Sequence, residues 1–220
     1  MPRETAAARQ HRATQVLAGL RAAYPDAHCE LHYSNPLELL VATILSAQAT
    51  DRQVNLVTAG LFQKYRTAHD YAAAEPAALA ADIQRLGLFR NKARHLRECG
   101  RQLVALHGGQ VPATLAELTA LAGVGRKTAN VVLGNAFGLN HGVVVDTHVA
   151  RLARRLGLSR GRTPEAIETG LMALAPAAEW TQLSHLLIWH GRRRCGARRP
   201  DCAACELQSL CPRTGVPAAS

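Results

Sequence analysis

Aromatic side chains make up only 4% of this chain of 220 residues. Proteins that bind single-stranded nucleic acid without sequence preference stack the bases on aromatic rings, so this scarcity argues against such a platform. Long apolar runs are missing as well, because Thr, Ser, Asn or charge interrupts each stretch before the roughly 20 residues that a membrane span needs. No basic-then-apolar signal segment opens the chain. We therefore expect a soluble, cytoplasmic protein that does not contact a membrane.

Lysine is also scarce, since the only lysines are Lys64, Lys92 and Lys127. The 26 basic residues, mostly arginine, outnumber the 16 acidic ones and give a net charge of +10. This imbalance favours an acidic partner, with nucleic acid as the leading candidate, although a merely solvated basic surface would give the same composition. Because lysine is so rare in this chain, a lysine next to a functional motif is a candidate for a specific role.

Alternating strand patterns are rare, and the run Val143-Val144-Val145 is too short to build a sheet. Helical spacing dominates instead, and 48% apolar residues suffice for a core without disulfides. Pro36 opens a helix with an apolar stripe through Leu45. The sequence therefore predicts an all-α fold. The predicted helix caps are Thr50 or Asp51, Asn91 for a helix that ends at Gly108 and Gly109, and Thr163.

A hairpin of two helices is predicted around Gly123-Val124-Gly125. Thr114 and Glu117 form a capping-box pattern for the first helix, and the second helix follows Gly125 directly. Glycine at both positions permits positive φ and leaves no Cβ to block a phosphate, which the first amides of the second helix could bind. A plain tight turn is the alternative, but the basic residues Arg126 and Lys127 and the hydroxyl of Thr128 favour phosphate.

Two polar residues are candidates for chemistry. Lys127 lies beside Arg126 at a helix N-terminus, where positive charge and the helix dipole disfavour the ammonium form, so it suits a nucleophile. A phosphate-binding lysine explains the same position equally well. Asp146 precedes a helix with the apolar face Val149, Leu152, Ala153 and Leu156. Its simplest role is that of an N-cap, which does not exclude catalysis.

Four of the six cysteines crowd the C-terminal part of the chain, with the spacing Cys195-x6-Cys202-x2-Cys205-x5-Cys211. Four thiolates in so short a stretch indicate one metal centre rather than disulfides. Chemistry alone leaves zinc and an iron–sulfur cluster open, although zinc sites usually pair two Cys-x-x-Cys knuckles and this loop has one. Cys29 and Cys99 are expected to be ordinary small apolar residues.

These motifs together resemble the endonuclease III family of DNA glycosylases, over about residues 37 to 211. The resemblance rests on three motifs: the hairpin from Leu121 to Ala129, the segment Val145-Asp146-Thr147-His148, and the cysteine spacing. The resemblance implies a bifunctional DNA glycosylase and abasic-site lyase that removes oxidised pyrimidines of the thymine glycol type. It also implies that a [4Fe-4S] cluster binds to the four cysteines, and that the protein is a monomer acting on double-stranded DNA, nucleoid-associated if bacterial.

The resemblance further assigns roles to individual residues. Lys127 is then the nucleophile that displaces the damaged base and forms a Schiff base with the sugar, and Asp146 assists it. The expected DNA contacts are Gly123, Val124, Gly125, Arg126 and Thr128 in the hairpin, Gln48 and Leu88 at the extruded base, His148, and Arg198 and Arg199 in the cysteine loop, which spans about residues 192 to 211.

Two helical domains with a cleft between them are implied, residues 29–140 and residues 1–28 with 141–220. The irregular stretch 138–142 is the best candidate for a boundary in the sequence itself. Two other functions stay open. Adenine-specific glycosylases of the same superfamily lack the lysine and use a glutamate, whereas Leu39 to Gln48 contains no acidic residue. In a non-catalytic DNA-binding module, Lys127 would only hold phosphate and the cysteines would hold zinc.

Overall fold

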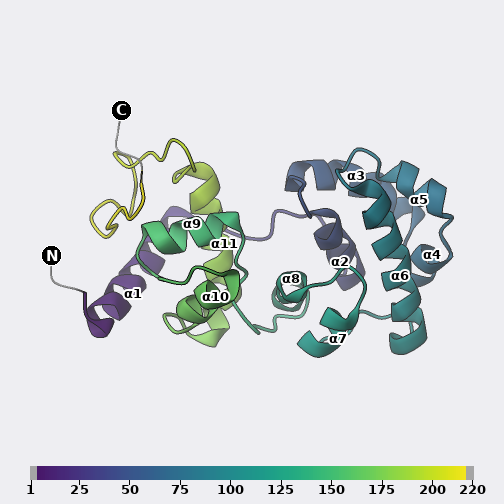
Figure 1. Ribbon diagram of the computed structural model, residues 1–220, viewed down its shortest axis with the longest axis horizontal. Helices are drawn as coiled ribbons and strands as arrows, with labels where there is room; N and C mark the ends of the chain where they lie inside the picture. The colour runs from purple at the N-terminus through teal and green to yellow at the C-terminus, as the bar shows by residue number, and fades with distance from the viewer. Residues whose placement is uncertain (1–3, 217–220) are drawn as a thin grey trace. The chain divides into compact units, whose positions relative to one another are not determined.

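The computed structural model describes residues 4–216 (Figure 1), and over this range every regular element is helical. The exception to helix and loop within it is one isolated bridge between Cys195 and Pro200. The predicted all-α fold is therefore confirmed. Two compact units make up the chain: one runs from Glu30 to Leu139, and the other combines the N-terminal part through Cys29 with the chain from Asn140 onward.

The middle unit is built around one almost fully enclosed helix. Its helices are α2 (Pro36–Leu45), α3 (Asp51–Lys64), α4 (Ala68–Ala73), α5 (Pro76–Asp82), α6 (Phe89–His107), α7 (Leu115–Ala120) and α8 (Arg126–Ala136). Every residue of α2 from Leu39 to Leu45 is buried, and α2 packs against α3, α6 and α8. The predicted one-sided stripe thus understates the burial of this helix, which forms the centre of the unit.

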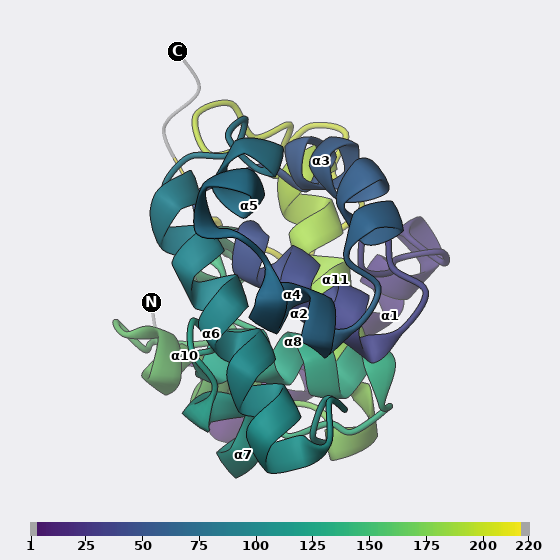
Figure 2. The ribbon, with the colours of Figure 1, turned by 90° about the vertical axis from the view of Figure 1, so that its right-hand side faces the viewer.

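The closest helix packing in this unit joins α4 and α6, which Figures 1 and 2 show side by side. Gly100 of α6 makes the approach possible. A Cβ at this position would lie 2.8 Å from the Ala72 backbone nitrogen and 2.9 Å from the Ala68 carbonyl oxygen. Any side chain at position 100 would clash with the α4 backbone at these distances, so glycine allows α4 and α6 to touch through their backbones. This contact holds in place the helix that Leu88 precedes.

The other unit combines both ends of the chain. Its helices are α1 (Ala6–Ala23), α9 (Thr147–Arg155), α10 (Pro164–Met172), the 3-10 helix η1 (Ala177–Glu179) and α11 (Trp180–Arg193). Helix α11 packs on both α1 and α9. The Gln10 amide also donates to the Leu174 carbonyl oxygen at 2.9 Å. The N-terminal helix is therefore part of the same core as the last helix.

Of the caps predicted at Thr50, Asn91 and Thr163, two are confirmed and one is wrong. Thr50 and Thr163 cap α3 and α10, and Asn35, directly before Pro36, caps α2. Asn91 lies inside α6, which begins at Phe89 and is preceded by Leu88 in the left-handed region. The left-handed turn starts the helix earlier than the polar side chain suggested.

Candidate active site and cysteine loop

The predicted hairpin joins α7 to α8 through Gly123-Val124-Gly125. Val124 is buried and donates its backbone N–H to the Leu121 carbonyl oxygen at 3.1 Å, so it anchors the turn. Gly123 has φ +78°, and a Cβ there would lie 2.9 Å from the His95 Cβ. Both the backbone conformation and the lack of space therefore require glycine at position 123.

Gly125 differs from the expectation. Its φ is −92° with ψ 174°, an extended conformation open to any residue, and nothing lies within 4 Å of an added Cβ. A need for positive φ therefore does not explain glycine at position 125. The second expected reason, open space for a phosphate beside the backbone, agrees with the structure. Gly125 also offers no side chain to cap α8, so the first-turn amides, from Arg126 to Thr128, receive no cap from it. An uncapped helix N-terminus with open space before it suits an anion.

Lys127 and Asp146 each lie in the first turn of a helix or just before it. Lys127 is the second residue of α8 and is exposed. Asp146 is half-buried and its Oδ1 accepts a hydrogen bond from the Val149 backbone N–H at 2.8 Å, so the predicted N-cap of α9 is present. Lys127 belongs to the middle unit and Asp146 to the other.

Gln48 and Leu88 share an unusual backbone conformation. Their φ angles are +54° and +60°, and among the described residues other than glycine only Arg213 shares this region. Leu88 is 54% exposed, and a Cβ on the neighbouring Gly87 would lie 4.0 Å from the Gln48 carbonyl oxygen, so the two turns are adjacent. Strained backbone at exposed positions is typical of functional sites. The structure thus brings together the two residues expected at the extruded base.

His148 is held by an arginine of its own helix. The Arg151 guanidinium lies 3.1 Å from His148 Nδ1 and donates to the carbonyl oxygens of Gly191 and Cys195, at 2.8 Å and 3.1 Å. Burial lowers the pKa of His148, which favours the neutral ring that can accept this hydrogen bond at Nδ1. The local contacts of His148 therefore join α9 to α11 and the cysteine loop.

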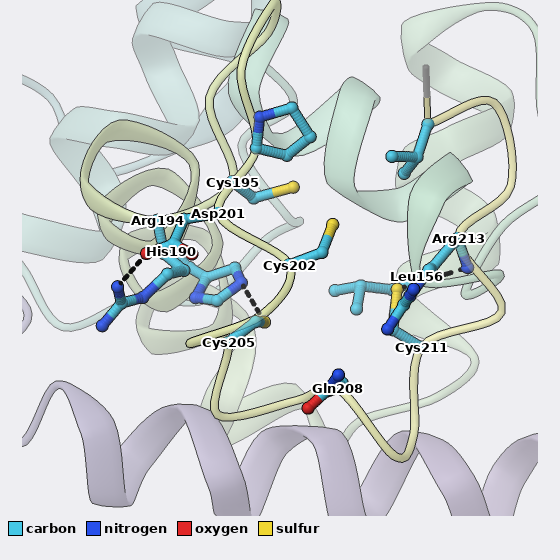
Figure 3. A pocket seen from close by; sticks show the side chains of 12 residues that line it. Leu156, His190, Arg194, Cys195, Asp201, Cys202, Cys205, Gln208, Cys211 and Arg213 are labelled. Atoms are coloured by element: carbon cyan, nitrogen blue, oxygen red, sulfur yellow. Dashed lines mark hydrogen bonds and ion pairs between the residues drawn. The ribbon is translucent and has the colours of Figure 1, made fainter. Parts of the chain in front are cut away.

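The four clustered cysteines line one pocket that is partly open to solvent (Figure 3). None of them forms a disulfide. N–H groups approach three of the sulfurs, from Arg155 Nη1 to Cys195 at 3.3 Å, from the Leu207 backbone to Cys205 at 3.4 Å, and from the Arg213 backbone to Cys211 at 3.4 Å. Such donors stabilise thiolates and tune metal-bound sulfur.

Burial raises the pKa of the Cys205 and Cys211 thiols, which disfavours their thiolate forms when no positive charge is nearby. No three His, Cys, Asp or Glu side chains within residues 4–216 converge closely enough to hold a single metal ion. The four cysteines instead line the pocket together with His190 and Asp201.

Arg155 organises the first half of the loop. It is 3% exposed and donates to the carbonyl oxygens of Gly196 and Ala197, both at 2.7 Å, besides the Cys195 sulfur. Sequence reasoning passed over Arg151 and Arg155 in favour of the arginines next to the cysteines. Their spacing of four residues on a helix with a known apolar face was the available signal.

The arginines next to the cysteines are not equivalent. Arg198 and Arg199 are exposed, as a DNA contact requires. Arg194 instead pairs with Asp201 at 2.6 Å and Glu206 at 3.0 Å, so its charge is neutralised within the loop. Arg193 lies over the Trp189 ring, 3.5 Å from its centroid. Part of the basic charge in this region is therefore structural.

Comparison with known proteins agrees with this arrangement. The family model described as HhH-GPD superfamily base excision DNA repair protein matches residues 41–177, which places the helical fold and its hairpin in that superfamily. Endonuclease III of Synechocystis sp. is 48% identical over 94% of both chains, and endonuclease III of Bacillus subtilis is 47% identical over 86% of both. This chain belongs to the endonuclease III family.

Two solved structures of endonuclease III with DNA are also similar to this chain. A trapped endonuclease III–DNA covalent intermediate and a non-covalent endonuclease III–DNA complex each superimpose with a TM-score of 0.89. Each is 45% identical to this chain, and each match covers 93% of this chain and 96% of the other.

No helix among the described residues is long and apolar enough to cross a membrane.

Proposed function

We propose that this protein is a bifunctional DNA glycosylase and abasic-site lyase of base excision repair, with Lys127 as its nucleophile. Its substrate is double-stranded DNA that contains an oxidised pyrimidine or an abasic site. The observation that carries the proposal is the position of Lys127 one residue into α8, directly behind a glycine-bearing hairpin whose helix N-terminus is not capped by a side chain. A protein 45% identical to this one has been trapped covalently on DNA.

The hairpin and the lysine divide the work. The amides at the start of α8 bind a backbone phosphate, which positions the protein without reading sequence. The neutral Lys127 amine then attacks the sugar C1′, the bond from C1′ to the base breaks, and a Schiff base forms with the opened sugar. Loss of the proton at C2′ allows β-elimination, which breaks the strand on the 3′ side. The Asp146 carboxylate assists by taking a proton from the lysine and by stabilising positive charge on the sugar.

The damaged base must leave the stack before Lys127 reaches the sugar, at a cost of a few kcal/mol. We assign Leu88 to the wedge and Gln48 to the space that the base leaves. The support is their adjacent turns, their left-handed backbone and the 54% exposure of Leu88, because more than half of this large apolar side chain is open to a further contact. His148, Arg198 and Arg199 are proposed as further contacts to the DNA backbone.

The residues of the cysteine loop fit a [4Fe-4S] cluster better than a zinc ion. All four cysteines line one pocket, and N–H groups approach three of their sulfurs, as is common for cluster ligands. Cys195, Cys202, Cys205 and Cys211 would hold the cluster, which supplies a rigid crosslink when bound. Arg155 and the backbone donors then hold the loop so that Arg198 and Arg199 face the DNA.

Borohydride trapping tests the proposal. Wild-type protein mixed with a duplex bearing thymine glycol or an abasic site should form a covalent product on addition of borohydride. Lys127→Gln should form none while binding the same duplex and keeping its helical circular dichroism. Lys64→Gln is the matched control, since Lys64 lies on the surface of α3, paired with Asp82 at 2.7 Å, and should not change trapping. Efficient crosslinking by Lys127→Gln would exclude this nucleophile.

A further inference from the structure

His190 is a buried histidine that the reaction above does not use. It lies on α11 with 1% of its surface exposed. Its two ring nitrogens face different partners. Nδ1 lies 3.0 Å from the hydroxyl of Tyr24, the residue that follows α1. Nε2 lies 3.6 Å from the Cys205 sulfur, a contact that Figure 3 marks with a dashed line. One imidazole therefore connects the end of α1 to the cysteine loop.

The proton positions follow from the chemistry of the partners. A metal-bound cysteine is a thiolate and has no proton to give, so a hydrogen bond between Nε2 and the Cys205 sulfur requires the proton on Nε2. In the neutral ring Nδ1 then has a lone pair, which the Tyr24 hydroxyl satisfies as donor. The Glu206 carboxylate is farther from Nδ1, at 3.9 Å, and is engaged by Arg194 at 3.0 Å. Tyr24 thus selects the tautomer that can donate to sulfur.

We propose that His190, with its tautomer set by Tyr24, donates an N–H···S hydrogen bond to Cys205 and thereby raises the reduction potential of the cluster. The inference rests on the proposed cluster. An N–H group aimed at a ligand sulfur withdraws negative charge and favours the form of the cluster with one more electron. His190 is a positioning residue, since it touches a ligand and not the DNA or the reacting atoms.

Voltammetry on the purified holoprotein measures this effect. The measurement would report the one-electron equilibrium of the bound cluster with the electrode, in which no bond forms or breaks and His190 Nε2 keeps its proton. His190→Gln places an amide N–H near the position of Nε2, whereas His190→Asn places it near Nδ1. We expect His190→Asn to shift the oxidation equilibrium about tenfold toward the oxidised cluster, which corresponds to about 59 mV for one electron. His190→Gln should restore most of this difference.

Controls separate this inference from the cluster itself. Iron content and the absorbance of the wild-type protein test the cluster, and an iron-free wild type would overturn both the cofactor assignment and the inference. With the cluster present, equal potentials for wild type and His190→Asn, or equal shifts for the Asn and Gln variants, would overturn the inference alone. Tyr33→Phe removes a hydroxyl from the middle unit, where it donates to the Asn135 carbonyl oxygen, and should leave the potential unchanged.

The tautomer can be measured even if a substitution at His190 prevents cluster binding. In ¹⁵N NMR spectra of the wild-type holoprotein, the His190 ring should show a protonated Nε2 and an Nδ1 that accepts a hydrogen bond. Tyr24→Phe should move the Nδ1 resonance toward that of a free acceptor and leave the Nε2 proton in place. A His190 ring with its single proton on Nδ1 would contradict the proposal.

Discussion

The Asp146 carboxylate accepts the backbone N–H of Val149 at 2.8 Å and so caps α9 with the same group that we assign to catalysis. The two roles can be separated, because asparagine caps a helix as well as aspartate does but carries no charge. We expect Asp146→Asn to slow base removal at least tenfold and to leave the free energy of unfolding within about 0.5 kcal/mol.

Asp146→Ala is the companion variant. It should be as slow as Asp146→Asn and should also lose about 1 kcal/mol of stability, since the cap is removed. Single-turnover kinetics and thermal unfolding check both variants. If Asp146→Asn weakened DNA binding as much as it slowed turnover, the carboxylate would act through structure rather than chemistry.

The two hairpin glycines should respond differently to alanine. Gly123→Ala combines a positive φ with a contact of 2.9 Å to the His95 Cβ, so we expect a loss of about 2 kcal/mol in the free energy of unfolding. Gly125→Ala meets open space in an extended backbone and should leave stability within about 0.5 kcal/mol. Its methyl group would occupy the proposed phosphate site, so DNA affinity should fall. Unchanged affinity in fluorescence anisotropy would remove the phosphate from this hairpin.

Leu88 offers a test in which stability and activity change in opposite directions. Leu88→Gly relieves the left-handed backbone of a 54% exposed residue and should raise the free energy of unfolding by about 0.5 to 1 kcal/mol. Base removal should slow because the wedge is lost. Leu88→Ala removes the same side chain but keeps the strain, so it should be slow without the gain in stability. Full activity in both variants would contradict the wedge assignment.

Stability should also depend on pH through His185. Burial, followed by the nearby His28 and Arg192, lowers the pKa of His185 from 6.5 to about 4. Above pH 6.5 the ring is neutral in both states; as the pH falls toward 4 the unfolded chain takes up a proton that the folded chain resists, so stability falls. At pH 5 the loss should be about 2 kcal/mol. The melting temperature of wild type should fall relative to that of His185→Gln between pH 7 and pH 5, and a parallel decline of the two would exclude this origin.

Much of the architecture was predictable because helix signals are local. Proline and polar caps at Pro36, Thr50 and Thr163 fix helix starts within one turn, and the apolar face beginning at Val149 predicted the burial of α9. Left-handed backbone is not local in this sense. The sequence around Leu88 does not predict its φ of +60°, which starts α6 at Phe89. The prediction that Asn91 caps this helix was therefore wrong.

The site was predictable where one motif contains its own chemistry, as in the hairpin and the cysteine spacing. Contacts between segments distant in sequence were not. Arg155 reaches the loop 41 residues later, and His190 joins Tyr24 to Cys205 across 166 and 15 residues. The charge of Arg194 is cancelled by Asp201 and Glu206, which only the folded loop brings together. Spacing along the chain identifies such groups without identifying their partners.

The joining of both chain ends in one unit has a consequence for synthesis. Helix α1 leaves the ribosome 157 positions ahead of the first residue of α11, on which it packs. At about 5 to 20 residues per second this is a wait of roughly 8 to 30 s, during which Val16, Leu17 and Leu20 lack the core that later buries them. The middle unit meanwhile emerges whole. We therefore expect the middle unit to fold first, and a chain that stops before α11 lacks the helix on which α1 packs.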